Sequence, residues 1–525
     1  MNDTILKLSG ITKHFGSVAA NEDVSFSLKQ GEIVALLGEN GAGKTTLMSI
    51  LFGHYVADQG SIEVFGKKLA QGSPRAALDA GVGMVHQHFT LAGNMTVLEN
   101  IMVGTASLFG VGNKAGRAAG KLTALMARFG LTVDPNALVR DLSVGEQQRV
   151  EILKVLYRDA RILILDEPTA VLTPPESDAL FKTLKQLVRE GLSVVFITHK
   201  MREVMAASHR CIVLRQGRVV FESRTEQTDP EALARAMVGA DIPRVVRKKR
   251  SPGREVLCLK DIFIGARDGK NAVKRLDLRL RSNEIIGIAG VSGNGQSELA
   301  DMISGLITPC RGRIFLGSGE LKKISPRIMI ERGVGRIPDD RNGTGLIGDM
   351  SIMENLASKN YGDPESSRKG FLRFNAMARQ AEKLVRQFDV RCPGINSPVR
   401  QLSGGNMQKL ILARELSGAP GIILANQPTW GLDVGAAAHV HTQLIQAAKQ
   451  GAGVIIISED LDELFQVSDR IQVMYHGQLS AAEDVDTLDR ARIGLMMSGQ
   501  GTDLGSGRSF GPKGQSNGGN KNHAA

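Results

Sequence analysis

Short apolar runs, each followed directly by polar residues, recur along the first half of the chain. Residues 33–37, 162–165 and 193–198 are almost wholly apolar and have the length of strands that are buried on both faces. The segments between them, such as 47–51 and 122–129, have the spacing of helices. Buried strands that alternate with helices, with polar groups at the strand ends, predict an α/β fold around a mostly parallel sheet.

The same order of elements recurs in the second half. Gly290 follows Gly38 by 252 positions (290 − 38), and Leu402 follows Leu142 by 260 (402 − 142). The offset therefore grows by 8 residues (260 − 252), and these 8 residues fall in a helical insertion between 339 and 403. We therefore predict a tandem duplication, with domains at 1–240 and 255–498 and a linker at 241–254. The Gly- and Asn-rich residues 499–525 are predicted to form a disordered tail.

A glycine-rich loop joins the first buried strand to the following helix. Strand, glycine loop, Lys, Thr and helix is the context that a phosphate-binding P-loop requires, so we expect a nucleoside triphosphate with Mg²⁺ here. Lys44 would reach the β- and γ-phosphates, and the Thr45 hydroxyl would contact Mg²⁺. Phe15 could stack on an adenine ring or pack in the core. The expected binding residues of the loop are Gly38, Glu39, Asn40, Gly41, Ala42, Gly43, Lys44, Thr45 and Thr46.

Composition narrows the class of protein. The 525 residues are 42% hydrophobic and 23% charged, as in soluble globular proteins, and no apolar run approaches the ~18–20 residues of a membrane span. The first residues show no secretion signal, and four scattered cysteines fit a reducing cytoplasm. The net charge of +11 could indicate a nucleic-acid or lipid partner, but the basic run at 244–250 falls in the predicted linker, where it is better explained as solvated.

The motif Leu-Ser-Val-Gly-Glu-Gln-Gln at 142–148 lies between the P-loop and Leu-Asp-Glu-Pro-Thr at 165–169. This order resembles the ATP-binding cassette (ABC) ATPases, and its presence in both halves extends the resemblance over almost the whole chain. Residues 337–341, followed by Gly345 and Leu346, resemble a segment of ribose and galactose importers. Segments 293–299 and 427–435 look most like the nucleoside and simple-sugar branch of ABC importers. The resemblance implies two tandem P-loop ABC ATPase domains, each with a mixed, mostly parallel sheet core and a helical subdomain.

The resemblance also implies catalytic roles in the first half. Asp166 would hold Mg²⁺, and Glu167 would polarise the attacking water as general base. His199 would contact the γ-phosphate. Gln87 would contact Mg²⁺ or the water, at the place where such domains meet the permease. Together with Lys44 these residue types position and neutralise the negative charge that spreads in phosphoryl transfer.

The second half departs from this pattern. Gln296 stands in place of the P-loop lysine, Asn426 in place of the metal-binding aspartate and Gln427 in place of the catalytic glutamate. Asp339 and Glu459 add negative charge where the first half has glutamine and histidine. Because an amide cannot accept a proton at neutral pH, this half is predicted to hydrolyse nothing.

Cassettes of this family pair head to tail. The intact first site would then be completed by Ser403, Gly404 and Gly405 of the second half, and Asp433 would also face it. Thr173 is the first-half counterpart of Asp433. The alternative is a one-domain enzyme with an inactive copy as a scaffold.

We therefore expect an ATPase that energises import of nucleosides or simple sugars. The resemblance implies two permease subunits, an extracytoplasmic binding protein, and a peripheral position on the cytoplasmic face of the inner membrane, with no nucleic acid. The alternatives are a soluble tandem-cassette ATPase acting on ribosomes or nucleic acid, and a non-hydrolysing nucleotide switch. Soluble factors of that type usually keep both catalytic glutamates and a long charged linker, so Gln427 counts against them. The cargo stays open.

Overall fold

The computed structural model describes residues 4–16, 18–86, 89–105, 114–169, 172, 174–239, 247, 249–265, 273–369, 371–497 and 499. The chain forms two compact units. The first comprises Met1–Val245 with Thr429–His441, and the second comprises Val246–Pro428 with Thr442–Ala525. Half of the predicted linker and nearly all of the predicted tail lie outside the described residues, so the predicted limits of domains, linker and tail stay predictions. Within the described residues, no helix combines the length and apolarity that crossing a bilayer would need.

The first unit is built on a six-stranded sheet. Its strands lie in the order β10 (Arg218–Arg224), β9 (Arg210–Arg215), β3 (Ile33–Leu37), β8 (Ser193–Ile197), β7 (Ile162–Asp166) and β6 (Val82–Val85). All neighbours are parallel except β9 and β10. Every residue of β3, β7 and β8 is buried, which confirms the apolar runs as internal strands.

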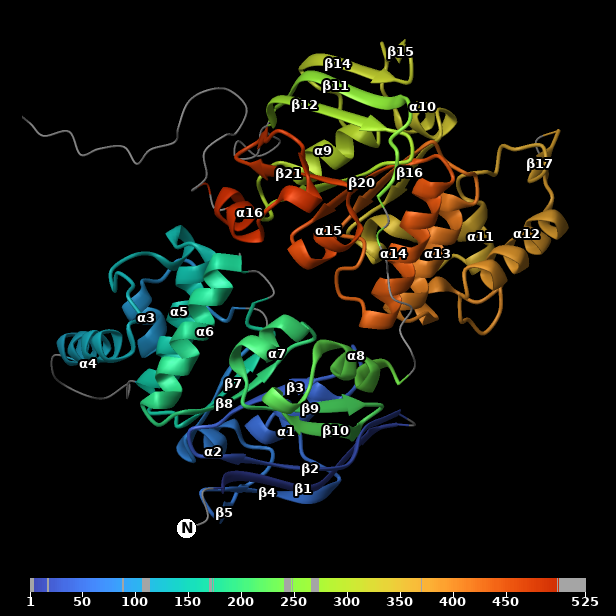
Figure 1. The fold of residues 1–525 in the computed structure, drawn as a ribbon. Helices are drawn as coiled ribbons and strands as arrows, with labels where there is room; N and C mark the ends of the chain where they lie inside the picture. Colours follow the sequence, from blue (N-terminus) through green and yellow to red (C-terminus); the bar gives the residue numbers. More distant parts are fainter. Residues whose placement is uncertain are drawn as a thin grey trace, which may run out of the picture. The chain divides into compact units, whose positions relative to one another are not determined.

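Both faces of this sheet are covered. On one side α1 (Lys44–Phe52) packs between it and an antiparallel sheet, and their apolar side chains form one core (Figure 1). That second sheet contains β2 (Val18–Lys29), β1 (Thr4–Phe15), β4 (Gln59–Val64) and β5 (Lys67–Lys68). A separate core on the other side is formed mainly by helices, which are α3 (Val97–Met102), α4 (Lys114–Phe129), α5 (Val144–Tyr157), α6 (Pro174–Arg189), α7 (Met201–Ala207) and α8 (Pro230–Val238). The short α2 spans Pro74–Asp79.

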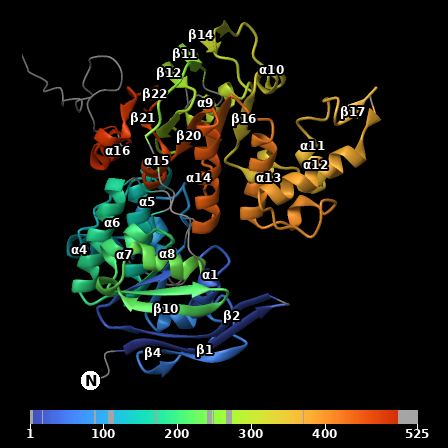
Figure 2. The same cartoon turned by 45° about the vertical axis from the view of Figure 1, so that its right-hand side comes forward.

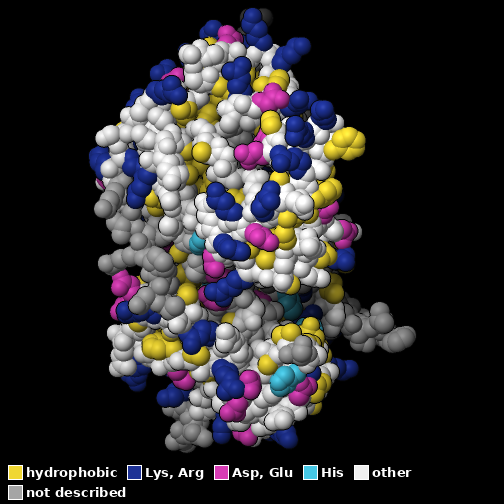
Figure 3. Space-filling view, turned by 90° about the vertical axis from the view of Figure 1, so that its right-hand side faces the viewer, with side chains coloured by type: hydrophobic (Ala, Val, Ile, Leu, Met, Phe, Trp, Pro, Cys, Tyr) yellow, Lys and Arg dark blue, Asp and Glu magenta, His cyan; other side chains and the backbone are white. Residues whose placement is uncertain are grey.

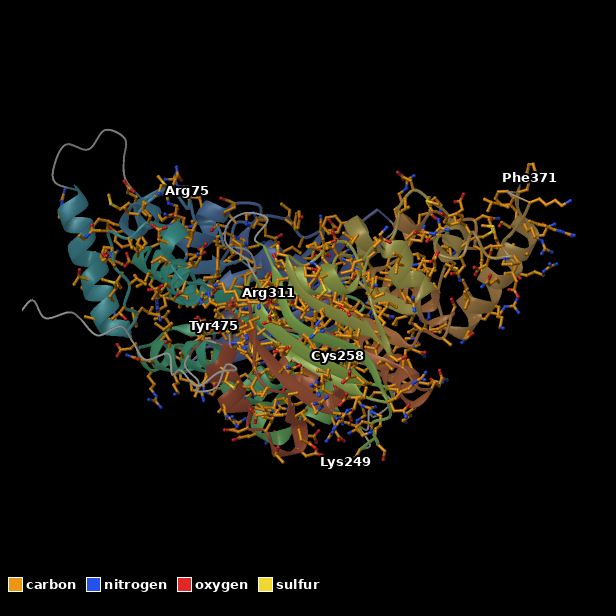
Figure 4. All side chains as sticks on the ribbon, turned by 90° about the horizontal axis from the view of Figure 1, so that it is seen from above. Arg75, Lys249, Cys258, Arg311, Phe371 and Tyr475 are labelled. Carbon is orange, nitrogen blue, oxygen red and sulfur yellow. The ribbon has the colours of Figure 1, made fainter. Side chains whose placement is uncertain are left out.

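The second unit repeats this plan. Its central sheet runs β16 (Val334–Ile337), β19 (Ile422–Asn426), β20 (Gly453–Ser458), β13 (Ile285–Ala289), β21 (Arg470–Tyr475) and β22 (Gln478–Leu479), and β23 (Glu483–Asp484) also pairs with β21. Its antiparallel sheet contains β12 (Val273–Arg281), β11 (Glu255–Ile264), β14 (Arg311–Leu316) and β15 (Gly319–Glu320), and α9 (Gln296–Ile303) packs between the two sheets (Figure 2). Cys258 of β11 and Arg311 of β14 mark this antiparallel sheet in Figure 4.

The remaining elements of the second unit are mostly helical. They are α10 (Pro326–Glu331), α11 (Ile352–Ala357), α12 (Phe374–Gln387), α13 (Gly404–Leu416), α14 (Val434–Lys449), α15 (Leu461–Val467), α16 (Arg490–Met497) and the ribbon β17 (Ser367–Arg368) with β18 (Phe371–Leu372). The first residues of α14 belong to the first unit. On the face drawn in Figure 3, Lys and Arg side chains are interspersed with acidic and hydrophobic ones. The predicted α/β class, with a mostly parallel sheet and helices in each repeat, is confirmed.

Candidate nucleotide site

The phosphate loop connects β3 to α1 through a turn that only glycine fits at two positions. Gly38 and Gly43 have φ angles of 156° and 98°. A Cβ atom on Gly43 would lie 2.1 Å from the carbonyl oxygen of Ala20, and one on Gly38 would lie 2.4 Å from that of Leu214. Because neighbouring backbone approaches so closely, both positions exclude a side chain. The loop is therefore shaped by contacts with other strands as well as by its own sequence.

Lys44 begins α1 and is only 6% exposed. Its Nζ donates to the carbonyl oxygens of Gly38 and Glu39, at 2.8 and 2.9 Å, so the ammonium group lies inside the loop. Burial lowers the pKa of Lys44, and the carboxylates of Glu167, Asp166 and Glu39 oppose that shift. A cation held at this place can contact the outer phosphates of a bound nucleotide.

The carboxyl end of β7 brings an aspartate to the first turn of α1. Asp166 is 5% exposed, and the Thr45 hydroxyl donates to its Oδ2 at 3.4 Å. Burial and the neighbouring charge of Glu167 raise the pKa of Asp166, whereas Lys44 and the Thr45 hydrogen bond lower it. A carboxylate beside a hydroxyl supplies the hard oxygen ligands that suit Mg²⁺, which usually takes few protein ligands and several waters.

Glu167 follows directly and has a φ angle of 45°, which is uncommon for a non-glycine residue. Its N–H donates to the carbonyl oxygen of Ile197 at 3.1 Å, and its Oε1 lies 3.1 Å from Nδ1 of His199. Burial raises the pKa of Glu167, but the hydrogen bond and charge of His199, together with the charges of Lys44 and Lys200, outweigh burial, so the pKa lies below its usual value. The carboxylate is therefore ionised at neutral pH and able to accept a proton.

One residue of this site escaped the sequence analysis. Glu203 of α7 is 7% exposed and accepts hydrogen bonds from the hydroxyl groups of Thr198, at 2.6 Å, and Thr169. It thereby ties the loop after β7, which carries Glu167, to the loop after β8, which carries His199. The only signal in the sequence is an acidic residue in a helical segment, and such a residue is usually solvated.

Phe15 and the start of α14 lie on the first unit as well. Phe15 is 45% exposed and meets Tyr55 edge to face, with ring centroids 5.4 Å apart, so the alternative of a core aromatic is wrong. The Asn40 side chain donates to the carbonyl oxygen of Gly431 at 2.7 Å. Burial and the charge of Asp433 raise the pKa of Glu39. Gly41 and Ala42 lie in the loop, and Thr46 lies in the first turn of α1.

The other predicted residues lie elsewhere. Ser403 caps α13 of the second unit, Gly404 and Gly405 begin that helix, and the Arg341 guanidinium donates to the Gly404 carbonyl at 3.4 Å. Their proposed role in completing the first site stays a prediction. Gln87 and Thr173 lie outside the described residues.

The second unit keeps the backbone conformation of the site, but neutral amide side chains stand in place of Lys44, Asp166 and Glu167. Gln427 has a φ angle of 47°, and its N–H donates to the carbonyl oxygen of Ile457 at 2.8 Å, as Glu167 does in the first unit. Asn426 ends β19. Gln296 is 7% exposed, and its amide donates to the Val291 carbonyl at 2.9 Å. The two units together define a tandem P-loop nucleotide-binding protein in which Lys44, Asp166, Glu167 and His199 of the first unit have no charged equivalents of the same type in the second.

Comparison with known proteins agrees with this class. The model of the ABC transporter family matches residues 21–170 and 273–430. The chain therefore belongs to the ABC transporter family and is an ATPase of the ATP-binding cassette type. ATP binding follows from this family, and the assignment of ATP to the loop at 38–46 stays a prediction.

Three curated relatives match nearly the whole chain. The nucleoside import ATP-binding protein NupA of Lactococcus lactis is 43% identical, covering 95% of this chain and 99% of its own length. The glucose import ATP-binding protein TsgD13 of Haloferax volcanii is 43% identical, covering 95% of this chain and 96% of its own. The guanosine import ATP-binding protein NupO of Bacillus subtilis is 42% identical, covering 94% and 97%.

A solved structure resembles the chain in fold. It contains an archaeal ribosome recycling factor in complex with a ribosomal stalk protein, with a TM-score of 0.59 at 18% identity over 88% of this chain and 87% of that one. At that identity the likeness concerns the fold alone.

Proposed function

We propose that ATP hydrolysis in the first unit energises the import of nucleosides or simple sugars through a partner membrane permease. The observation that carries this proposal is one site in which Lys44, Asp166, Glu167 and His199 occur together, in a chain whose relatives at 42–43% identity are named for nucleoside, guanosine and glucose import. An extracytoplasmic binding protein would select the cargo, and the chain would lie on the cytoplasmic face of the membrane.

The site residues divide the chemistry among themselves. Lys44 binds the β- and γ-phosphates, and Glu167 orients the attacking water and accepts its proton. His199 contacts the Glu167 carboxylate and would contact the γ-phosphate. Thr45 and Asp166 would hold Mg²⁺, which, when bound, neutralises charge on the phosphate oxygens. Phe15, exposed at the end of β1, would stack on adenine.

The second unit would contribute to hydrolysis without performing it. Gln427 cannot accept a proton, and Gln296 carries no charge. We infer that Ser403, Gly404 and Gly405 complete the first site, with Asp433, when the two cassettes close head to tail. A motif that closes on the γ-phosphate from another domain is worth roughly 10³–10⁵ in rate in related systems. Hydrolysis would then depend on closure, which is how it could drive a permease.

A groove in the second unit supports docking of a permease. Its volume is about 310 Å³, and three half-exposed apolar residues line it: Leu306 (47%), Ile330 (40%) and Ile347 (55%). Exposed apolar residues around a concave surface are typical of protein contacts. Pro338, next to the counterpart of Gln87, also lines the groove. The resemblance implies a permease contact near that position, so we assign the groove to an apolar segment of a permease.

The rival functions lack comparable support. The likeness to a ribosome recycling factor concerns the fold, and Gln427 replaces a glutamate that such factors usually keep. A non-hydrolysing switch would not need the ionised carboxylate of Glu167 beside His199.

The experiment that tests the proposal compares two matched substitutions. Lys44→Ala removes the cation from the first P-loop, and Gln296→Ala changes the equivalent position of the second. ATP turnover by the purified chain should fall at least about a hundredfold in the first variant, because the outer phosphates lose their cation, and stay within about twofold in the second. Equal losses in both variants would contradict a single hydrolytic site.

A further inference from the structure

The second P-loop, at residues 290–297, donates hydrogen bonds to a carboxylate of its own unit. Glu459 follows β20, and its Oε1 accepts a hydrogen bond from the Ser292 N–H at 2.8 Å and another from the Ser292 hydroxyl. Ser292 stands at the position of Asn40 in the first loop, and Glu459 at that of His199. A backbone N–H and a hydroxyl in a P-loop are donors that otherwise bind phosphate oxygens.

The first unit has a different arrangement at these positions. His199 contacts Glu167, and the Asn40 side chain is bonded to a backbone carbonyl. Among the described residues, no side-chain oxygen accepts a hydrogen bond from the Asn40 N–H. Within the described part of the chain, a carboxylate that accepts hydrogen bonds at this position of the loop is therefore found in the second unit and not in the first.

The second loop is also held together internally. The Gln296 amide donates to the Val291 carbonyl at 2.9 Å, and its Oε1 accepts from the Asn294 N–H at 3.1 Å. The Asn294 side chain donates to the same carbonyl and accepts from the His476 N–H. A neutral amide thus occupies the place of the lysine that contacts the outer phosphates.

We propose that Glu459 excludes the γ-phosphate, so that the second P-loop is a site for a nucleoside diphosphate rather than a triphosphate. This inference takes the second P-loop as a nucleotide site, on its likeness to the first, and does not rest on the import function proposed above. The backbone N–H groups at the start of α9 stand where those of α1 stand in the first loop, and N–H groups at that place bind the inner phosphates of a nucleotide. The γ-phosphate would meet the Glu459 carboxylate, with no lysine to offset the repulsion.

The test is photolabelling of the intact chain with 8-azido-ADP and 8-azido-ATP in EDTA, which prevents hydrolysis in the first unit. Mass spectrometry of the labelled peptides separates the second site from the first. We expect the second unit to bind the diphosphate about tenfold or more tightly than the triphosphate, because like charges in contact repel strongly in a partly buried site.

Glu459→Gln should abolish this preference by tightening triphosphate binding, and Glu459→His should act in the same direction. Asp460→Asn is the matched control, because it removes the neighbouring carboxylate, which accepts hydrogen bonds from the Asp462 and Glu463 N–H groups and none from Ser292 among the described residues. It should leave the ratio unchanged. Equal labelling of the second unit by both nucleotides in the unmodified chain, no labelling by the diphosphate, or an unchanged ratio in both Glu459 variants would overturn the inference. Failure of the unmodified chain to hydrolyse ATP would instead refute the proposed function.

Discussion

Replacing Glu167 by Gln tests the chemistry of the first site with the smallest change in shape. The side chain keeps its volume, its position after β7 and its distance to His199, but it loses the negative charge and the ability to accept a proton. The structure indicates that this charge is present at neutral pH, because the pKa of Glu167 lies below its usual value.

The expected loss follows from the role of a general base. A positioned base contributes about 10²–10⁴ in rate, which corresponds to roughly 2.7–5.4 kcal/mol of the barrier at about 1.36 kcal/mol for each factor of ten. ATP binding should change by less than about threefold, because the phosphates are held mainly by the loop and Lys44. The variant should therefore bind ATP and fail to turn it over.

The assay is phosphate release by the purified chain under saturating ATP, together with equilibrium binding of ATP to the same preparations. Gln427→Glu is the matched control, since it restores a carboxylate in the second unit, where Gln296 and Asn426 still differ from the first. It should add no turnover. Phosphate release at the unmodified rate in Glu167→Gln would refute the assignment of Glu167 as the base.

Two further predictions concern residues outside the phosphate loop. Ser403→Arg should stop hydrolysis although it lies in the second unit, whereas Ser143→Arg, at the matching position of the first unit, should spare most of the hydrolysis. Normal phosphate release in Ser403→Arg would count against completion of the first site by the second unit. Glu203→Gln should lower the free energy of unfolding by about 1–3 kcal/mol and reduce turnover, because an amide cannot accept from both Thr169 and Thr198 with the strength of a carboxylate. Thermal unfolding measures the loss of stability, and phosphate release measures the loss of turnover. Glu463→Gln is the equivalent change in the second unit. An unaltered turnover in Glu203→Gln would show that hydrolysis does not need the link between the loops after β7 and β8.

The sequence was sufficient for the parts of the fold that depend on local pattern. The strands β3, β7 and β8 are buried on both faces, so their apolar runs were recognisable without any tertiary information. The P-loop was equally recognisable, because glycine, lysine and threonine must stand at fixed spacing between a strand and a helix.

Contacts between distant segments could not be predicted in this way. Glu203 matters because the loops after β7 and β8 meet at its carboxylate, and nothing in its own segment signals that meeting. The sequence assigned Glu459 only an added negative charge, whereas its hydrogen bond to Ser292 joins positions 167 residues apart. Phe15 left two alternatives, and its exposure at the end of β1 excludes the core aromatic, whereas stacking on adenine stays a prediction.

The most direct test of the central claim is a pull-down of the tagged full chain from its own membranes in mild detergent, with partners identified by mass spectrometry. We predict a polytopic permease at stoichiometric yield, and we expect Ile330→Asp to lose it, because a charge would be placed in the apolar groove of the second unit. Recovery of ribosomal proteins or nucleic acid with no membrane protein would contradict the importer and favour the soluble class of tandem cassettes.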